Sequence, residues 1–334
     1  MENLEGAINK FQNQKILVIG DIILDKFSYG ITDRLNPESI SPLVKIISEE
    51  YVLGGAANVA NNISSLGAHC ILYGTIGGDY EKEIKKLCCQ RGIDFFYYQN
   101  HLPTIIKQRF ISKNPTTPEQ QVLRADYGEY LIKKLNSNVF ISSFDEQLRE
   151  NIEEFDFIVL SDYDKQLFTK PFSEHILSLA NSYDIPILVD PKPQNIAYFR
   201  GCNVICPNKK EAEEITGVKY KNGKDTLIEI SSKLAEIVNS KHIFITCGED
   251  GVFGYDPQTK EHIQIETKVH KVADVTGAGD TFSAALTLGL ASGLNMHDAG
   301  KLANYAAGII VEKIGTATTT QEELMYRIKQ DYGY

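Results

Sequence analysis

Residues 274–282 read DVTGAGDTF, and a helical pattern continues from there to about Gly293. The triplet Gly277, Ala278 and Gly279 allows a tight turn directly before the helix begins near Asp280. The backbone amides of such a turn and the positive end of the helix dipole point at one place, which makes that place an anion site. The stretch therefore predicts an anion-binding turn with the carboxylate of Asp280 beside it.

A carboxylate next to an anion-binding turn has two interpretations. Asp280 could be a capping carboxylate that only stabilises the start of the helix. It could also take the proton from an alcohol that attacks a phosphoryl group, while the turn meets the charge of that group. The sequence contains no GxxxxGK[ST] run, so the site is not a P-loop. The short pattern by itself leaves both interpretations open.

The rest of the chain predicts an α/β fold. Short apolar runs alternate with helical patterns, which indicates a mostly parallel sheet with helices on both faces, in three α/β/α layers. The expected buried strands are 16–19, 157–160, 187–189, 204–206 and 243–245, and a helix is expected over 56–66. Polar residues follow these strands at once, among them Asp21, Asp162, Asp190 and Thr246. Because ligands of open parallel sheets bind at the carboxyl ends of the strands, we expect a polar cleft there, although any one of these residues could be a turn former.

Two stretches break this alternation, at about residues 22–51 and 95–111. Both have residues that alternate in polarity without long helices between them, which predicts antiparallel strands in a small β-sheet lid. A sheet with an apolar face and free edges needs a cover, so we expect a homodimer formed through the lid. No linker, repeat or low-complexity segment separates the lid, and residues 1–334 are expected to form one domain.

Composition excludes several classes of protein. The chain has 334 residues, 43% hydrophobic and 23% charged, as in ordinary globular proteins. Its formal net charge of −10 argues against a nucleic-acid or anionic-membrane partner. The six cysteines lack the spacing of a zinc site and are expected to be reduced thiols. With no signal-peptide pattern and no apolar run of about 20 residues, the sequence predicts a cytoplasmic protein.

Three motifs follow one another along the chain, namely GGAANVA at 54–60, NKKE at 208–211 and DVTGAGDTF at 274–282. Together they resemble the motifs of the ribokinase-like (PfkB) carbohydrate kinases, and the resemblance covers about residues 15–324. It implies a Rossmann-like sheet with a small β lid, ATP with Mg²⁺, and attack by a sugar hydroxyl that Asp280 activates. The anion hole would then consist of Gly277, Ala278 and Gly279.

The same resemblance implies roles for further residues. Those expected at the nucleotide are Asn208, Glu211, Thr246, Gly248 and Asn304, with Glu211 organising Mg²⁺ through water or phosphate. For Asn304, a plain position on a surface helix is the alternative. A monovalent cation such as K⁺ is expected near Asp274 and the loop 315–318.

One subgroup of the family fits best. The stretches 20–30, 34–39, 107–109, 120–126, 161–163 and 189–192 are similar to those of the heptose 7-phosphate kinases. That likeness implies phosphorylation of the anomeric hydroxyl of D-glycero-D-manno-heptose 7-phosphate to the 1,7-bisphosphate, on the way to ADP-heptose and lipopolysaccharide core. The residues expected at this substrate are Asp21, Asp25, Gly54, Gly55, Asn58, Arg109, Asp162, Asp190 and Lys192.

The chemistry of a phosphorylated sugar agrees with this choice of residues. Carboxylates and amides such as Asp25 and Asn58 can hydrogen-bond several hydroxyls, and a phosphate needs a cation. The candidates for that cation are Arg109 and Lys192, with Arg34 as a third, each of which could instead be a solvated surface charge.

The sequence also departs from the subgroup. Residues 161–166, SDYDKQ, replace the usual glycines after the tyrosine, and 315–318 only approximate the usual last loop. Some relatives carry a C-terminal adenylyltransferase, and we expect a separate protein to supply that activity here. Two other functions stay open, a kinase of another phosphorylated sugar such as a ketohexose phosphate, and a non-catalytic sugar-binding regulator.

Overall fold

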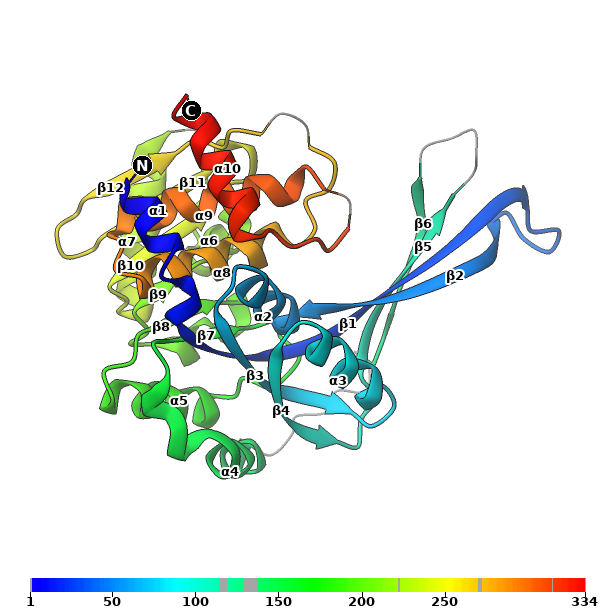
Figure 1. Ribbon diagram of the computed structural model, residues 1–334, viewed down its shortest axis with the longest axis horizontal. Helices are drawn as coiled ribbons and strands as arrows, with labels where there is room; N and C mark the ends of the chain where they lie inside the picture. The colour runs from blue at the N-terminus through cyan, green and yellow to red at the C-terminus, as the bar shows by residue number, and fades with distance from the viewer. Residues whose placement is uncertain are drawn as a thin grey trace.

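The computed structural model describes residues 2–113, 119–128, 137–221, 223–269, 272–313 and 315–333 (Figure 1). Its strands are β1 (Lys15–Leu35), β2 (Pro42–Gly55), β3 (His69–Gly77), β4 (Ile93–Asn100), β5 (Ile105–Ser112), β6 (Gln120–Tyr127), β7 (Phe157–Ser161), β8 (Ile187–Asp190), β9 (Val204–Ile205), β10 (His242–Thr246), β11 (Val252–Tyr255) and β12 (His262–Ile265). Its α-helices are α1 (Glu2–Ile8), α2 (Ala56–Ser65), α3 (Glu81–Gln90), α4 (Ser137–Leu148), α5 (Lys170–Ser182), α6 (Lys209–Thr216), α7 (Lys224–Val238), α8 (Ala278–Ala291), α9 (Met296–Val311) and α10 (Gln321–Asp331).

The main sheet carries its strands in the order β12-β11-β10-β9-β8-β7-β1-β3-β4. All neighbours from β10 to β4 run parallel, whereas β10 with β11 and β11 with β12 are antiparallel. Each parallel step needs a crossover, which the helices between the strands supply. The predicted α/β fold with a mostly parallel sheet is therefore confirmed.

Helices cover both faces of this sheet. Strand β1 shows the reason, because Ile16 and Val18 point to one apolar core and Leu17 and Ile19 to the other. The first core contains buried residues of α1, α2, α3, α8, α9 and α10, and the second contains those of α4, α5, α6 and α7. The three predicted layers are therefore present. The carboxyl ends of the central strands lie at one edge of the sheet, between the two layers of helices.

Strand β1 leaves the main sheet and continues into a second one (Figure 1). Up to Asp21 it pairs with β3 and β7, and from Ile22 onward it pairs with β2 and β5. Strand β6 pairs with β5 and completes this sheet, which we call the β lid. Because one continuous strand belongs to both sheets, the lid is anchored directly at the edge of the cleft.

The lid differs from the prediction in one part. The range 95–111 was expected to lie in it, but β4, which contains Phe95 and Tyr97, pairs in parallel with β3 at the edge of the main sheet. Only β5 from that range belongs to the lid, and β6 was not predicted. An edge strand that is covered on one face has the same alternating pattern as a lid strand, so the sequence could not separate the two.

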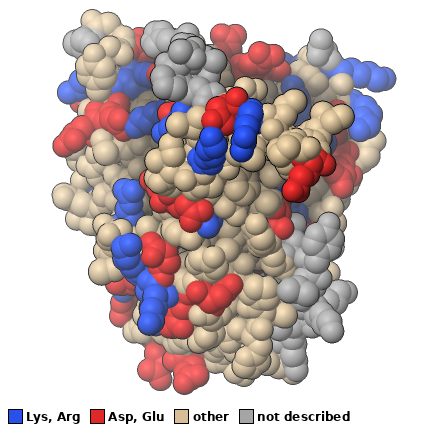
Figure 2. All heavy atoms as spheres, turned by 90° about the vertical axis from the view of Figure 1, so that its right-hand side faces the viewer, with Lys and Arg blue, Asp and Glu red and all other residues tan. Residues whose placement is uncertain are grey.

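Several large apolar side chains of the lid are exposed to solvent. They are Leu35, Ile40, Ile46, Ile47, Leu123 and Tyr127. On the side of the molecule toward which the lid projects, basic and acidic side chains are interspersed and separated by uncharged surface (Figure 2).

Within the described ranges, none of the helices combines the length and hydropathy that a membrane span requires.

Candidate active site

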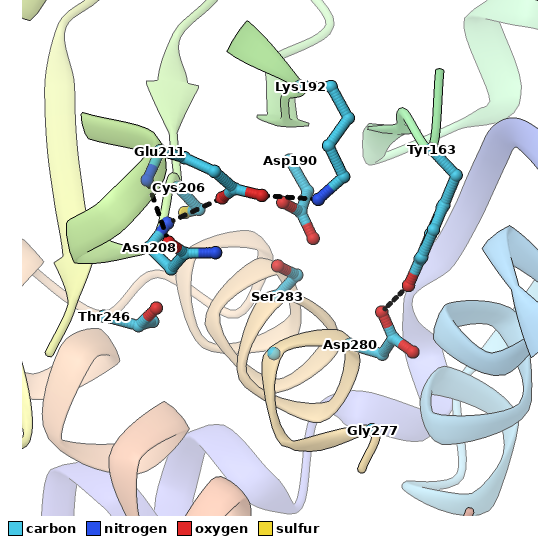
Figure 3. Close-up of a pocket in the computed structure, with 11 residues that line it drawn as sticks. Tyr163, Asp190, Lys192, Cys206, Asn208, Glu211, Thr246, Gly277, Asp280 and Ser283 are labelled. Atoms are coloured by element: carbon cyan, nitrogen blue, oxygen red, sulfur yellow. Dashed lines mark hydrogen bonds and ion pairs between the residues drawn. The ribbon is translucent and has the colours of Figure 1, made fainter. Parts of the chain in front are cut away.

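A cavity of about 180 Å³ lies at the carboxyl ends of the central strands, beside the start of α8 (Figure 3). Residues from the ends of β7, β8, β9 and β10 and from the first turns of α6 and α8 surround it. Its lining residues are Tyr163, Asp190, Lys192, Cys206, Asn208, Glu211, Thr246, Gly277, Gly279, Asp280 and Ser283. The polar cleft predicted from the strand ends therefore exists, and Asp280 lies in it.

The turn before α8 has the conformation that an anion site requires. Gly277 has φ +81°, a left-handed conformation, and a Cβ there would lie 3.0 Å from Asn58 Nδ2. The amide of Ala278 donates to Val275 O at 3.3 Å, whereas in the described chain the amides of Gly279 and Asp280 have no hydrogen-bond acceptor. Of the three residues predicted for the anion hole, Ala278 thus uses its amide to close the turn.

The carboxylate of Asp280 is held by two donors from other elements. Its Oδ1 accepts from the Tyr163 hydroxyl at 2.5 Å, and its Oδ2 accepts from Asn58 Nδ2 at 2.7 Å. Burial raises the pKa of Asp280, and the two hydrogen bonds act in the opposite direction. The side chain is 8% exposed and faces the cavity, not the amides of its own helix (Figure 3). This geometry does not support the capping interpretation.

A buried network fixes Asn58 in turn. The side-chain amide of Asn62, one turn along α2, donates to the backbone carbonyl of Asn58 at 2.9 Å. The hydroxyl of Thr281, next to Asp280, donates to Asn62 Oδ1 at 2.7 Å. Because Asn58, Asn62 and Thr281 are all buried, this chain ties α2 to α8 and sets the orientation of the carboxylate.

On the lid side, Asp25 of β1 forms an ion pair with Arg109 of β5. Both side chains are largely buried, and Arg109 also lies over the ring of Phe27, 5.4 Å from its centroid. Gly54 passes so close that a Cβ there would lie 2.4 Å from Asp25 Oδ2, and Gly55 adopts φ +59° at the start of α2. The structure thus brings together four of the residues predicted for the sugar.

Two other predicted substrate residues have a different role. Asp21 accepts backbone N–H groups from Tyr163, Lys165 and Leu167 at 2.9, 3.0 and 3.2 Å. Asp162 accepts from the amides of Asp164 and Lys192 and from the Asn195 side chain. Both carboxylates are fully buried, so they hold the loops after β7 and β8 instead of reaching a substrate. Burial, followed by the charge of Asp162, raises the pKa of Asp21 to about 7.

The opposite side of the cavity is lined by Asp190, Lys192, Asn208 and Glu211. Asn208 and Glu211 form a capping box at the start of α6, and Lys192 forms an ion pair with Glu211. Burial raises the pKa of Asp190 well above its usual value, although Lys192 acts to lower it. Lys192 lies beside Glu211 and Asp190 (Figure 3). Arg109 instead pairs with Asp25 on the lid side. The two cations predicted for the sugar phosphate therefore have different partners.

Of the remaining residues predicted at the nucleotide, Thr246 lines this cavity, whereas Gly248 and Asn304 are not among its lining residues. Thr246 also forms an isolated parallel β-bridge with Asn208. The carbonyl of Gly248 accepts from the Thr267 hydroxyl, which also donates to Asn304 Oδ1 at 3.2 Å. Asn304 lines a second cavity of about 330 Å³. A contact between Asn304 and adenine stays a prediction.

Asp274 connects the two loops where a monovalent cation was predicted. Its carboxylate accepts from the amide and hydroxyl of Thr276 at 2.9 and 2.8 Å and from the amide of Gly315 at 3.1 Å. Partial burial acts to raise the pKa of Asp274, but the hydrogen bonds from Thr276 and Gly315 lower it. Arg34, the third candidate for the sugar phosphate, is exposed near the end of β1 in the lid.

Four residues of the site were not predicted. The sequence indicates Tyr163 only as part of the stretch 161–163, and Cys206 only as one of six reduced thiols. Lys107 lies on β5 with its amine 5.2 Å from the centroid of the Tyr163 ring, and Ser283 lies one helical turn after Gly279. The position of Ser283 three residues after Asp280 was the one available signal, since it puts both on one face of a helix.

A buried carboxylate beside open amides of a helix start, with a lysine and a second carboxylate across the cavity, is an arrangement that can serve phosphoryl transfer to an alcohol. The chain belongs to the pfkB family of carbohydrate kinases, which matches residues 13–323. The family resemblance seen in the sequence is therefore confirmed.

Curated relatives support the same family. The bifunctional protein HldE of Aliarcobacter butzleri (strain RM4018) is 36% identical over 319 residues, covering 92% of this chain and 63% of the relative. The chain thus spans just under two thirds of that relative. The D-beta-D-heptose 7-phosphate kinase of Bordetella bronchiseptica (strain ATCC BAA-588 / NCTC 13252 / RB50) is 33% identical over 313 residues, covering 93% of this chain and 95% of the relative.

Solved structures share the fold. Phosphofructokinase-2 from Escherichia coli in complex with potassium superimposes with a TM-score of 0.77 at 17% identity, covering 95% of this chain and 98% of that one. Arabidopsis thaliana ribokinase complexed with ribose and ATP gives a TM-score of 0.71 at 16% identity, covering 95% and 99%. The predicted ribokinase-like fold is therefore confirmed.

Proposed function

We propose that this chain is an ATP-dependent kinase that phosphorylates the anomeric hydroxyl of D-glycero-D-manno-heptose 7-phosphate to give the 1,7-bisphosphate. The observation that carries the proposal is the Asp280 carboxylate, fixed beside the open amides of Gly279 and Asp280. The choice of substrate is supported by the heptose 7-phosphate kinase of Bordetella bronchiseptica, which aligns over nearly its whole length.

In the proposed reaction, Asp280 accepts a hydrogen bond from the anomeric hydroxyl and takes its proton as the oxygen attacks the γ-phosphorus of ATP. The amides of Gly279 and Asp280 and the positive end of α8 would meet the charge on the transferred group. Lys192, next to Glu211, would contact the same phosphates.

Among the residues that the structure describes, no three metal-ligating side chains converge, so Mg²⁺ would be held here largely by water and phosphate oxygens, with carboxylates of the cavity beside it. Asp190, Glu211 and Asp280 all line the cavity, with Lys192 as the lysine among the lining residues. Burial raises the pKa of Asp190, and a divalent cation would balance the excess of negative charge around it. Glu211 and Asp190 would hold the ion through water or phosphate oxygens. When bound, Mg²⁺ supplies charge neutralisation at the β- and γ-phosphates.

A cationic group at the base of the lid favours a phosphorylated sugar over a neutral one. Burial lowers the pKa of Lys107, and the positive charges of Arg124, Lys165 and Arg109 lower it further, whereas Asp25 opposes them. These four cations share the region with two carboxylates, since Arg109 is paired with Asp25 and Arg124 with Asp126. The remaining excess of positive charge would be stabilised by an anion such as a sugar phosphate. The heptose 7-phosphate would then lie with its anomeric carbon at Asp280 and its phosphate under the lid.

Measuring ADP release across a panel of sugars and sugar phosphates tests the proposal. The panel contains heptose 7-phosphate, fructose 6-phosphate, ribose and fructose, each with MgATP. We expect turnover with heptose 7-phosphate at a kcat/KM at least about 10²-fold above the others, since the site would lose its phosphate contacts with unphosphorylated sugars. Higher kcat/KM with fructose 6-phosphate would favour the kinase of another sugar phosphate. Sugar binding without any turnover would favour a regulator.

The proposal also includes a homodimer, a monovalent-cation site and a cytoplasmic location. Strands β2 and β6 each pair on one side within the described chain, and exposed Ile46, Ile47 and Leu123 lie on these strands, which supports a homodimer through the lid. A K⁺ ion near Asp274 and Gly315 would activate turnover relative to tetramethylammonium. A cytoplasmic location would supply ATP and keep the six cysteines reduced.

A further inference from the structure

We propose that Tyr163 is a positioning residue for the base, holding the Asp280 carboxylate ionised and oriented toward the acceptor hydroxyl. The inference rests on the proposed function, because it assigns a role at the same site. It concerns the loop after β7, which connects the main sheet to the helical layer of α5 (Figure 1, Figure 3).

The two donors to Asp280 come from opposite sides of the carboxylate. Tyr163 binds Oδ1 at 2.5 Å from the loop after β7, and Asn58 binds Oδ2 at 2.7 Å from α2. One donor on each oxygen prevents the carboxylate from rotating about its Cβ–Cγ bond. A carboxylate has about four acceptor positions, so two stay available for the acceptor hydroxyl. The base is thus fixed without being blocked.

The loop that carries Tyr163 is held in a strained conformation. Asp164 and Gln166 have φ values of 56° and 76°, in the left-handed region that favours glycine. The backbone hydrogen bonds from Tyr163, Lys165 and Leu167 to the buried Asp21 fix the loop against that strain. Strain of this kind persists where the surroundings over-determine the backbone, and it concentrates at functional sites. Here the hydrogen bonds to Asp21 fix the backbone from which the Tyr163 side chain projects.

The ring of Tyr163 is held independently of its hydroxyl. The amine of Lys107, from the lid, lies 5.2 Å from the ring centroid, and that of Lys192, from the cavity, lies 5.5 Å from it. Both contacts are cation–π interactions with the ring and do not involve the hydroxyl. Replacing Tyr163 by phenylalanine therefore keeps the ring in place and removes only the donor to Asp280.

Removing that donor raises the pKa of Asp280, because a hydrogen bond to the ionised form favours ionisation. The charged groups that face Asp280 from the other elements are Asp25 of β1, Lys107 of β5 and Asp190 at the end of β8. They are the same in the wild type and in Tyr163→Phe. Because the base must be ionised, the low-pH limb of kcat/KM should move to higher pH in the variant.

The test compares pH profiles of the wild type, Tyr163→Phe and Tyr97→Phe. Tyr97 is a matched control, because its hydroxyl also donates to a carboxylate, that of Glu81 at 2.7 Å, but outside the cavity. We expect the low-pH limb of Tyr163→Phe to rise by about one pH unit, with kcat recovering at high pH and KM for ATP within about twofold. Tyr97→Phe should match the wild type. ATP and the sugar phosphate change protonation with pH in the same way for all three proteins, so their titration does not account for a difference between the pH profiles.

A pH-independent loss of rate, or a normal profile, in a folded Tyr163→Phe protein would overturn the proposal. The pKa of Asp280 is also measured directly by ¹³C NMR of labelled aspartate carboxyls in the protein without substrate, with Asp280→Asn giving the assignment. An upward shift in Tyr163→Phe supports the role of Tyr163 even if no sugar is turned over. Failure of the proposed function and failure of this inference are thus distinguishable.

Discussion

Replacing Gly54 by alanine perturbs the contact between the glycine pair and the sugar side of the cavity. A Cβ at residue 54 would lie 2.4 Å from Asp25 Oδ2, 3.0 Å from Asp25 Cγ and 3.3 Å from the carbonyl oxygen of Ile23. The first distance is too short for any real Cβ, so either Asp25 or the backbone must move. Asp25 is 5% exposed and ion-paired with Arg109, and it has little room to do so.

The size of the effect follows from that crowding. Overpacking a buried site costs about 1–3 kcal/mol. An unfolding entropy of about 2.1 cal/mol/K per residue over 334 residues amounts to about 0.7 kcal/mol/K, so Tm should fall by about 1.5–4 °C. Because Asp25 and Arg109 are displaced together, KM for the sugar phosphate should rise several-fold. KM for ATP should stay within about twofold, since the nucleotide side is not touched.

Calorimetry and steady-state kinetics measure both effects, and Gly6→Ala is the matched control. Gly6 lies in α1, and a Cβ there would meet nothing within 4 Å. Alanine in the helix should stabilise the protein by about 0.5–1 kcal/mol and leave both KM values unchanged. A Gly54→Ala protein with the wild-type Tm and sugar KM would refute the role assigned to this contact.

Two further predictions concern the cations and the lid. Arg109→Ala should raise KM for the sugar phosphate about tenfold or more and leave KM for ATP nearly unchanged. Lys192→Ala removes the partner of Glu211 and should mainly raise KM for ATP. This division is contradicted if steady-state kinetics give both variants the same ratio between the change in KM for the sugar phosphate and the change in KM for ATP. Ile47→Lys, at a side chain that is 67% exposed on β2, should convert a lid-mediated dimer to a monomer in light scattering, with Tyr326→Lys, 65% exposed on α10, as control. A dimer that persists in Ile47→Lys excludes this part of the lid as the interface.

Much of the fold could be predicted because its signals are local. The buried strands are short apolar runs, and the glycine turn with Asp280 lies within nine residues. Strand β1 was only partly predicted, because its first half is buried on both faces and its second half continues into the lid. Strand β4 was placed in the lid because a half-covered edge strand and a lid strand have the same period.

The parts of the site that were missed depend on long-range geometry. Tyr163 and Asp280 are 117 residues apart, and Asn58 and Asp280 are 222 apart, so no local pattern relates them. Asp21 has the residue type and the strand-end position of a sugar ligand, but its two oxygens accept amides of a loop some 140 residues away. Residue type indicates what a side chain can do, whereas the direction in which it points depends on the tertiary structure.

The pre-steady-state rate of phosphoryl transfer in Asp280→Asn tests the role of the base most directly. Asparagine keeps the size of the side chain and can still accept one hydrogen bond, but it cannot take the proton. We expect ATP to bind with a Kd within about threefold of the wild type, while the transfer rate falls by about 10²–10⁴. Asp94→Asn, at an exposed carboxylate on β4, should transfer at the wild-type rate. A transfer rate in Asp280→Asn within a few-fold of the wild type would contradict the assignment of Asp280 as the base.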